Sequence, residues 1–187
     1  MTETNTTKWL KYLLYVGIAA MANTILNIFL PSVANWISPI LTLAALFVMS
    51  RLVPSNGRYL RVILFSGATV LITILNIQQV ALAGAICSIV GQYQEFTAHG
   101  ELIRELNKKL ADKWGSLFWL QFAVSIITTL LGSVLTALLV ASGAVDVDTA
   151  SAMIVVAAAL VTLLLRVLYL SYLSKTIKTL EADVTVE

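Results

Sequence analysis

Polar side chains recur at helical spacing inside otherwise apolar stretches of this sequence. Gln121, Ser125 and Thr128 stand at positions i, i+4 and i+7, which lie on one face of an α-helix. Two earlier apolar stretches carry similar residues. An unpaired amide in hydrocarbon costs several kcal/mol, so these polar faces are expected to point toward one another. The residues that would form this polar pathway are Asn23, Asn27, Thr69, Thr73, Asn76, Gln121, Ser125 and Thr128.

Two functions are compatible with such faces. They can line a pathway for a small solute or ion between helices, which would make the protein a channel or transporter. They can also hold a bundle together, because Asn, Gln, Ser and Thr form hydrogen bonds from helix to helix. The stripes contain no acid or base of the kind that usually marks coupled transport, which favours the second interpretation of the stripes. A non-transporting structural or regulatory membrane module is therefore the alternative function.

A second group of polar residues stands where an apolar stretch gives way to charge. Glu95 and His99 are spaced i, i+4, Gln92 is one turn earlier, and Arg61 is expected at the same depth on another helix. Histidine titrates near neutral pH, so this inner-mouth site could sense pH. Ordinary ion pairing in solvent is the alternative interpretation, and it is favoured at an interface.

Small residues at helical spacing mark a third face, on which helices can approach closely. This face could pack within the chain or against a second copy in a homo-oligomer. Cys87 lies among these residues and is interpreted as a packing residue. The helix-packing face consists of Ala81, Gly84, Ala85, Ser88 and Gly91.

Several kinds of chemistry are not expected. Cys87 is the single cysteine and His99 the single histidine, so a disulfide within the chain and a metal or redox centre are not predicted. The sequence has no glycine-rich phosphate loop and no Ser-His-Asp set. We therefore expect no enzymatic activity and no cofactor. The mixed charges of residues 97–113 argue against nucleic acid as a partner.

Composition predicts the elements that carry these residues. Hydrophobic residues make up 59% of the chain and charged residues 12%, which is typical of a protein surrounded by lipid. The sequence predicts an all-α integral membrane protein, a single transmembrane domain over residues 1–187, with six helices arranged as three consecutive hairpins. The expected spans are about 9–30, 33–52, 59–77, 80–96, 114–140 and 149–174. Residues 97–113 are expected to form a cytoplasmic amphipathic helical segment that could bind a protein partner or anionic lipid.

Basic residues set the expected orientation. With six spans, every lysine and arginine falls on one side or, like Arg166, close enough to reach it, and the positive-inside rule makes that side cytoplasmic. Both termini would then be cytoplasmic, and the bacterial inner membrane is the expected location. Aromatic residues such as Tyr59, Trp114 and Tyr169 are expected at the inner interface.

A repeated pentapeptide supports the hairpin arrangement. TILNI occurs at residues 24–28 and again at residues 73–77, near the expected outer ends of the first and third helices. Residues 129–132 have the related sequence TLLG at the corresponding place in the fifth helix. Three hairpins inserted in the same sense would explain this spacing, while chance similarity between apolar helices is the alternative.

Overall fold

The computed structural model describes residues 2–29, 37–53, 57–74, 80–143 and 145–184, and the regular structure in them is helical. The predicted all-α class and the order of the helices are confirmed. The helices are α1 (Thr2–Phe29), α2 (Ile37–Leu52), α3 (Arg58–Ile74), α4 (Ala81–Ile103), α5 (Lys108–Ala141) and α6 (Val147–Val184).

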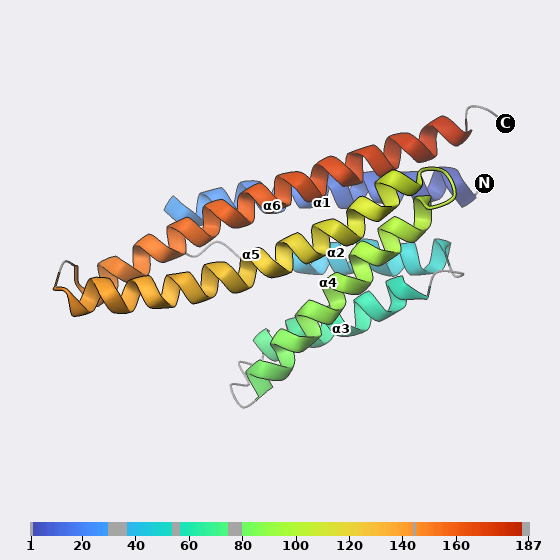
Figure 1. Ribbon diagram of the computed structural model, residues 1–187. Coiled ribbons are helices and arrows are strands. Elements are labelled where there is room, and N and C mark those ends of the chain that lie inside the picture. The colour runs from blue at the N-terminus through green and yellow to red at the C-terminus, as the bar shows by residue number, and fades with distance from the viewer. Residues whose placement is uncertain (1, 30–36, 54–56, 75–79, 144, 185–187) are drawn as a thin grey trace.

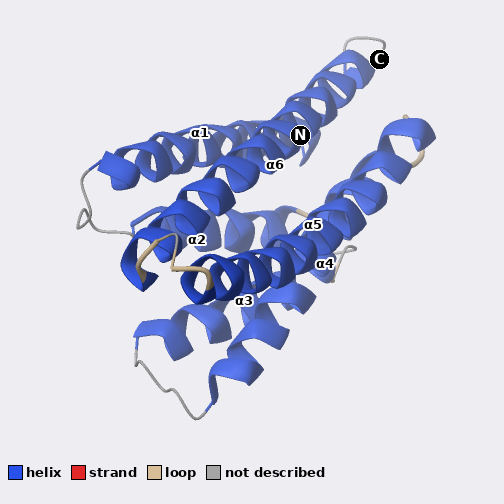
Figure 2. Ribbon diagram, turned by 60° about the vertical axis from the view of Figure 1, so that its left-hand side comes forward, coloured by secondary structure: helices blue, strands red, loops and turns tan. Residues whose placement is uncertain are grey.

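Consecutive helices pack against each other, and α6 returns to pack against α1 (Figures 1 and 2). In addition, α4 contacts α6. Among the described residues, α1, α3 and α5 do not pack extensively against one another, because α2, α4 and α6 lie between them in this ring of neighbours. This arrangement differs from the expected meeting of polar faces on the first, third and fifth helices.

The two ends of the molecule differ in shape. The start of α1 and the end of α6 lie at one end, together with the end of α4 and the beginning of α5 (Figure 1). From there α5 and α6 run side by side to the opposite end, whereas α3 and α4 diverge from them (Figure 1). The helices therefore form one joint assembly at the first end and separate pairs farther away.

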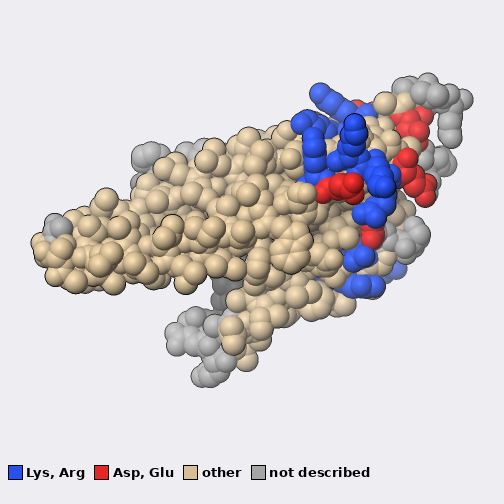
Figure 3. Space-filling view, in the orientation of Figure 1, with Lys and Arg blue, Asp and Glu red and all other residues tan. Residues whose placement is uncertain are grey.

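The buried core lies at the end where the helices come together. Its members come from short segments of all six helices, including Leu10, Met49, Val62, Ile103 and Leu173. In the face shown in Figure 3, lysine, arginine, aspartate and glutamate side chains gather at this same end. We call it the charged end.

The rest of α5 and α6 is apolar and exposed. Within the described residues, two helices are long and apolar enough to cross a membrane, Lys108–Ala141 and Val147–Asp183, and Ile40–Leu52 is a shorter apolar helix. Almost none of the most apolar part of either long helix is buried. Leu130 and Leu164, for example, keep 62% and 68% of their surface exposed. The expectation of six spans is thus supported for two helices and stays a prediction for the other four.

Residues 97–113 do not form a separate helix. The structure continues α4 to Ile103 and begins α5 at Lys108, where the Asn107 side chain accepts a hydrogen bond from the backbone N–H of Leu110 at 3.0 Å. Ile103 and Leu110 are both buried in the core. The apolar side chains expected to face a partner or lipid are thus covered largely by the protein itself, although Leu106 is exposed.

Two other helices extend well beyond the predicted spans. α1 begins at Thr2, and α6 continues to Val184, because polar residues outside an apolar stretch can extend a helix that is already formed. The expected start of the second helix at 33–36 and the expected end of the third at 75–77 lie outside the described residues.

Candidate functional site

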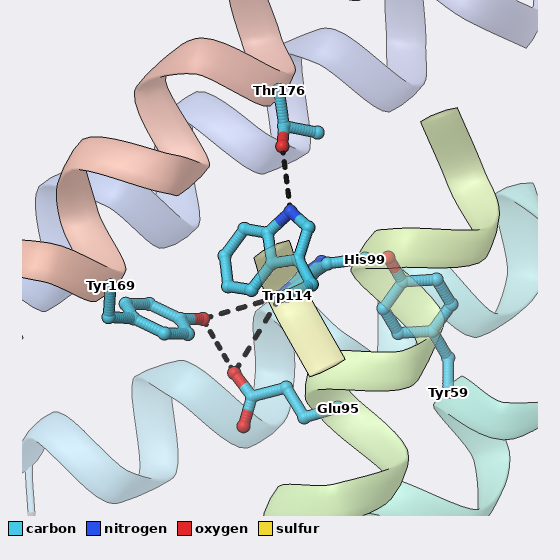
Figure 4. Close-up of polar contacts among 6 residues, drawn as sticks. All are labelled: Tyr59, Glu95, His99, Trp114, Tyr169 and Thr176. Atoms are coloured by element: carbon cyan, nitrogen blue, oxygen red, sulfur yellow. Dashed lines mark hydrogen bonds and ion pairs between the residues drawn. The ribbon is translucent and has the colours of Figure 1, made fainter. Parts of the chain in front are cut away.

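Four polar side chains from three helices meet at the charged end. They are Tyr59 from α3, Glu95 and His99 from α4, and Tyr169 from α6 (Figure 4). We call this group the polar cluster. Glu95 and His99 are one helical turn apart and therefore share a face of α4. His99 and Tyr59 are completely buried, and the Glu95 side chain is 16% exposed.

Hydrogen bonds connect the whole polar cluster. The Tyr59 hydroxyl lies 3.0 Å from Nδ1 of His99, and Nε2 of His99 lies 3.3 Å from the Tyr169 hydroxyl oxygen. That hydroxyl donates to Oε1 of Glu95 at 2.6 Å. Oε1 is also 3.7 Å from Nε2 of His99. The chain of contacts joins α3 and α6 through α4.

When the His99 ring is neutral, the hydrogen bond that Tyr169 donates determines which nitrogen of His99 carries the ring proton. Because Tyr169 donates its proton to Glu95, its oxygen is available to accept a hydrogen bond from Nε2–H of His99. Nδ1 is then unprotonated and accepts from the Tyr59 hydroxyl. Both nitrogens of the buried ring are satisfied in this tautomer, and so are both tyrosine hydroxyl protons.

Aromatic rings enclose the polar cluster. Trp114 of α5 is completely buried, its ring centroid is 4.9 Å from that of His99, and its Nε1–H donates to Oγ1 of Thr176 on α6 at 3.0 Å. Phe96 packs edge-on against both Trp114 and Tyr169. A water-poor surrounding strengthens hydrogen bonds between the enclosed groups. Tyr59 and Trp114 are thus core residues, although the sequence predicts them at an interface.

Ion pairs join helices at the outside of the charged end. Arg58 of α3 donates from Nε to Glu101 of α4 at 2.8 Å and from Nη1 to Gln94 at 3.1 Å. Lys11 of α1 forms an ion pair with Glu181 of α6. These partly exposed pairs contribute little individually. The Arg58 pair joins α3 to α4, as the polar cluster does, and the Lys11 pair joins α1 to α6.

The structure divides the predicted inner-mouth site. Glu95 and His99 lie together as expected. Gln92 is turned toward α5, where its Oε1 accepts from Nε2 of Gln121 at 3.3 Å. Arg61 is exposed and makes no side-chain hydrogen bond or ion pair within the described residues.

The described members of the predicted polar pathway have different surroundings. Thr69 donates to the carbonyl oxygens of Phe65 at 3.0 Å and of Gly84 on α4 at 3.3 Å. Gln121 bonds to Gln92, whereas Ser125 is exposed and Thr128 is partly buried. The remaining members, Asn23, Asn27, Thr73 and Asn76, have side chains outside the described residues.

Part of the predicted helix-packing face lies against α3. A Cβ added at Gly84 would be 3.2 Å from Ile72, and one at Gly91 would be 2.9 Å from the Ser66 hydroxyl oxygen. Ser88 is partly buried and accepts a hydrogen bond from Gln92 at 3.5 Å. Ala85 is exposed, and the side chain of Ala81 lies outside the described residues. Cys87, next to this face, is partly buried with a free thiol.

Sequence reasoning found two of the four members of the polar cluster. It missed Tyr59 and Tyr169, which are 40 and 70 residues from His99 along the chain. A usable signal was present, because a buried histidine needs two partners and both tyrosines stand at the same expected depth. No group of three or more histidine, cysteine, aspartate or glutamate residues that could hold a metal ion occurs in the described part of the chain.

The geometry allows the polar cluster to fasten three helices together. No family model, curated protein or solved structure matches this chain.

Proposed function

We propose that this protein is a non-enzymatic, multipass protein of the bacterial inner membrane, inserted as three helical hairpins with both termini in the cytoplasm. One observation carries the proposal: the apolar lengths of α5 and α6 are exposed, while the buried core and the charged side chains seen in Figure 3 lie at the charged end. A soluble core helix of the same composition would be mostly buried. Extended apolar surface of this kind is stable when lipid covers it.

The lengths of the two helices fit a bilayer. Asp148 and Arg166 are the charged residues that bound the apolar part of α6, and their separation of 18 positions corresponds to about 27 Å of helix. In α5, the separation of 20 positions from Gln121 to Ala141 corresponds to about 30 Å. The hydrocarbon core of a bilayer is about 30 Å thick. The charged end would then begin at the inner boundary of the hydrocarbon and continue into the cytoplasm.

We further propose that the protein acts as a structural or regulatory membrane module. Several described polar side chains bond from one helix to the next, as Thr69 does to Gly84, Gln121 to Gln92 and Tyr169 to Glu95. Polar residues used in this way hold helices at fixed positions in the membrane. The enclosed polar cluster serves the same purpose at the charged end.

A channel or transporter for a small solute or ion is the second candidate. The hydrogen-bonded chain from Gln121 through Gln92 to Ser88 favours it, because these side chains are only partly buried and their bonds of 3.3 and 3.5 Å are long. Water or a solute that enters between α4 and α5 would replace these bonds at small cost.

Cysteine labelling in liposomes separates the two candidates. We expect Gln121→Cys, made in a Cys87→Ala background, to resist a small water-soluble thiol reagent, because lipid and helices enclose this position. Glu105→Cys is the matched control, since Glu105 is exposed at the charged end and should react quickly. Reaction of both positions at similar rates would contradict the structural module and support a water-filled pathway.

A further inference from the structure

Arg166 stands at the end of the apolar part of α6 that is nearer the charged end of the molecule. It is exposed, and within the described residues it has no hydrogen bond or ion pair. Its neighbours Leu164, Val167 and Leu168 are exposed hydrophobic residues. Charged side chains in such surroundings are costly in a membrane, so they usually have a partner and mark a binding site or pathway.

The helical spacing directs Arg166 toward the bundle. Arg166, Tyr169, Leu173 and Ile177 stand at positions i, i+3, i+7 and i+11 and share one face of α6. Tyr169 reaches Glu95 and His99 of α4 from this face (Figure 4), and Leu173 and Ile177 are buried in the core. The guanidinium therefore extends from the side of α6 that turns toward α4.

Arg166 also lies at the level of the Gln92–Gln121 pair. On α4, Gln92 is three residues before Glu95, which is bonded to Tyr169, and its side chain is bonded to Gln121 of α5. α5 and α6 are antiparallel, with Trp114 beside Thr176 and Gly132 beside Ile154. Counting along both helices from these two contacts places residues 120–124 of α5 opposite Arg166. Three neighbouring helices thus carry a guanidinium and two amides in one layer.

We propose that Arg166, with Gln92 and Gln121 beside it, binds a phosphate oxyanion at the inner boundary of the membrane. A planar guanidinium donates two parallel hydrogen bonds to phosphate, and amide N–H groups can donate more. The backbone of Arg166 lies about 27 Å along α6 from Asp148, just within the inner boundary of the hydrocarbon core, and its long side chain can extend from there to the lipid phosphates of the inner leaflet. The same chemistry would accept the phosphate of an anionic phospholipid or a free phosphate ion.

Binding of defined probes tests this site, which rests on the proposed membrane location. The purified full chain in a neutral detergent is titrated with short-chain phosphatidylglycerol, short-chain phosphatidylcholine or sodium phosphate, and bound molecules are counted by native mass spectrometry. We expect Arg166→Gln to weaken phosphatidylglycerol binding at least about tenfold, because charge-assisted hydrogen bonds are lost. Arg166→Lys should keep part of the affinity, since it retains the charge without the planar fork.

Lys175→Gln is the matched control, because Lys175 is an exposed base on the same helix, nine residues nearer the C-terminus. Lys175→Gln should change the affinity for phosphatidylglycerol less than about twofold, as expected for an exposed charge that does not contact the bound lipid. Equal losses in Arg166→Gln and Lys175→Gln would overturn the site and indicate general attraction to a basic surface. Binding of sodium phosphate with the same dependence on Arg166 would identify a free anion as the ligand, whereas binding of phosphatidylglycerol alone would identify a lipid.

Two controls keep the result interpretable. Resistance of wild type and variants to alkaline carbonate extraction from membranes tests the membrane location separately, so an inserted protein that binds no phosphate refutes only the site. If Arg166→Gln unfolds earlier than wild type, the affinities of Arg166→Lys and Lys175→Gln for phosphatidylglycerol are compared instead, and this comparison tests the site. A bidentate guanidinium contact would be contradicted if Arg166→Lys and Lys175→Gln both bound phosphatidylglycerol with the affinity of wild type.

Discussion

A buried imidazole is stable when both of its nitrogens have partners, and in this protein two tyrosines supply them. Tyr59 and Tyr169 come from α3 and α6, so the single histidine of the chain connects helices that are distant in sequence. Glu95 completes the arrangement by accepting the proton of Tyr169. Removing one member therefore leaves another member buried with an unused polar group.

His99→Phe is expected to destabilise the protein by about 1–3 kcal/mol, because the Tyr59 hydroxyl would stay buried without an acceptor. The measurement is unfolding in a denaturing detergent, followed by the fluorescence of Trp114, whose ring lies against His99. Adding Tyr59→Phe should recover part of the loss, because it removes the unsatisfied hydroxyl. Strict additivity of the two substitutions would show that the Tyr59–His99 bond does not contribute.

At the scale of the helices, apolar periodicity and composition were sufficient to predict the number and order of the elements. The boundaries near residues 97–113 were not predictable in the same way, because apolar residues at helical spacing predict an amphipathic helical segment but not where one helix ends and the next begins. In the structure Ile103 and Leu110 are buried by other helices, and Asn107 caps α5. Tertiary packing that local sequence does not encode decided where α4 ended and α5 began.

An aspartate caps the start of α6. The Asp146 carboxylate accepts hydrogen bonds from the Thr149 backbone N–H at 2.7 Å and from its hydroxyl at 3.1 Å. These bonds, the backbone one first, lower the pKa of Asp146 below its ordinary value of 3.8. A lowered pKa in the folded state means that the carboxylate stabilises the helix start above pH 3.8 and loses this effect as the pH falls through the lowered pKa.

Carbon-13 NMR of labelled aspartate in detergent micelles measures this titration. We expect the midpoint of Asp146 to lie below 3.8 in wild type. Thr149→Val should raise the midpoint but keep it below that value, because the variant loses the hydroxyl and retains the backbone N–H. A midpoint at the ordinary value in wild type would contradict the capping arrangement.

At the scale of the whole molecule, charge and packing are concentrated at one end and exposed apolar helix extends from it. The sequence predicted the grouping of charges through the positive-inside rule. It did not predict that polar residues of the odd-numbered helices would bond to α4, as Thr69 and Gln121 do, because the choice of neighbours depends on how the helices pack. Composition alone likewise could not place Tyr59 and Trp114 in the core.

The central claim is that lipid covers the exposed apolar surface of α5 and α6, and cysteine labelling of intact proteoliposomes tests it most directly. Leu130→Cys and Leu164→Cys, in a Cys87→Ala background, place thiols at positions that are 62% and 68% exposed on the protein. Lys175→Cys serves as the control at the charged end. Our account predicts that a charged maleimide modifies Lys175→Cys and leaves Leu130→Cys and Leu164→Cys unmodified. Rapid modification of all three would place the apolar surface in water and contradict the account.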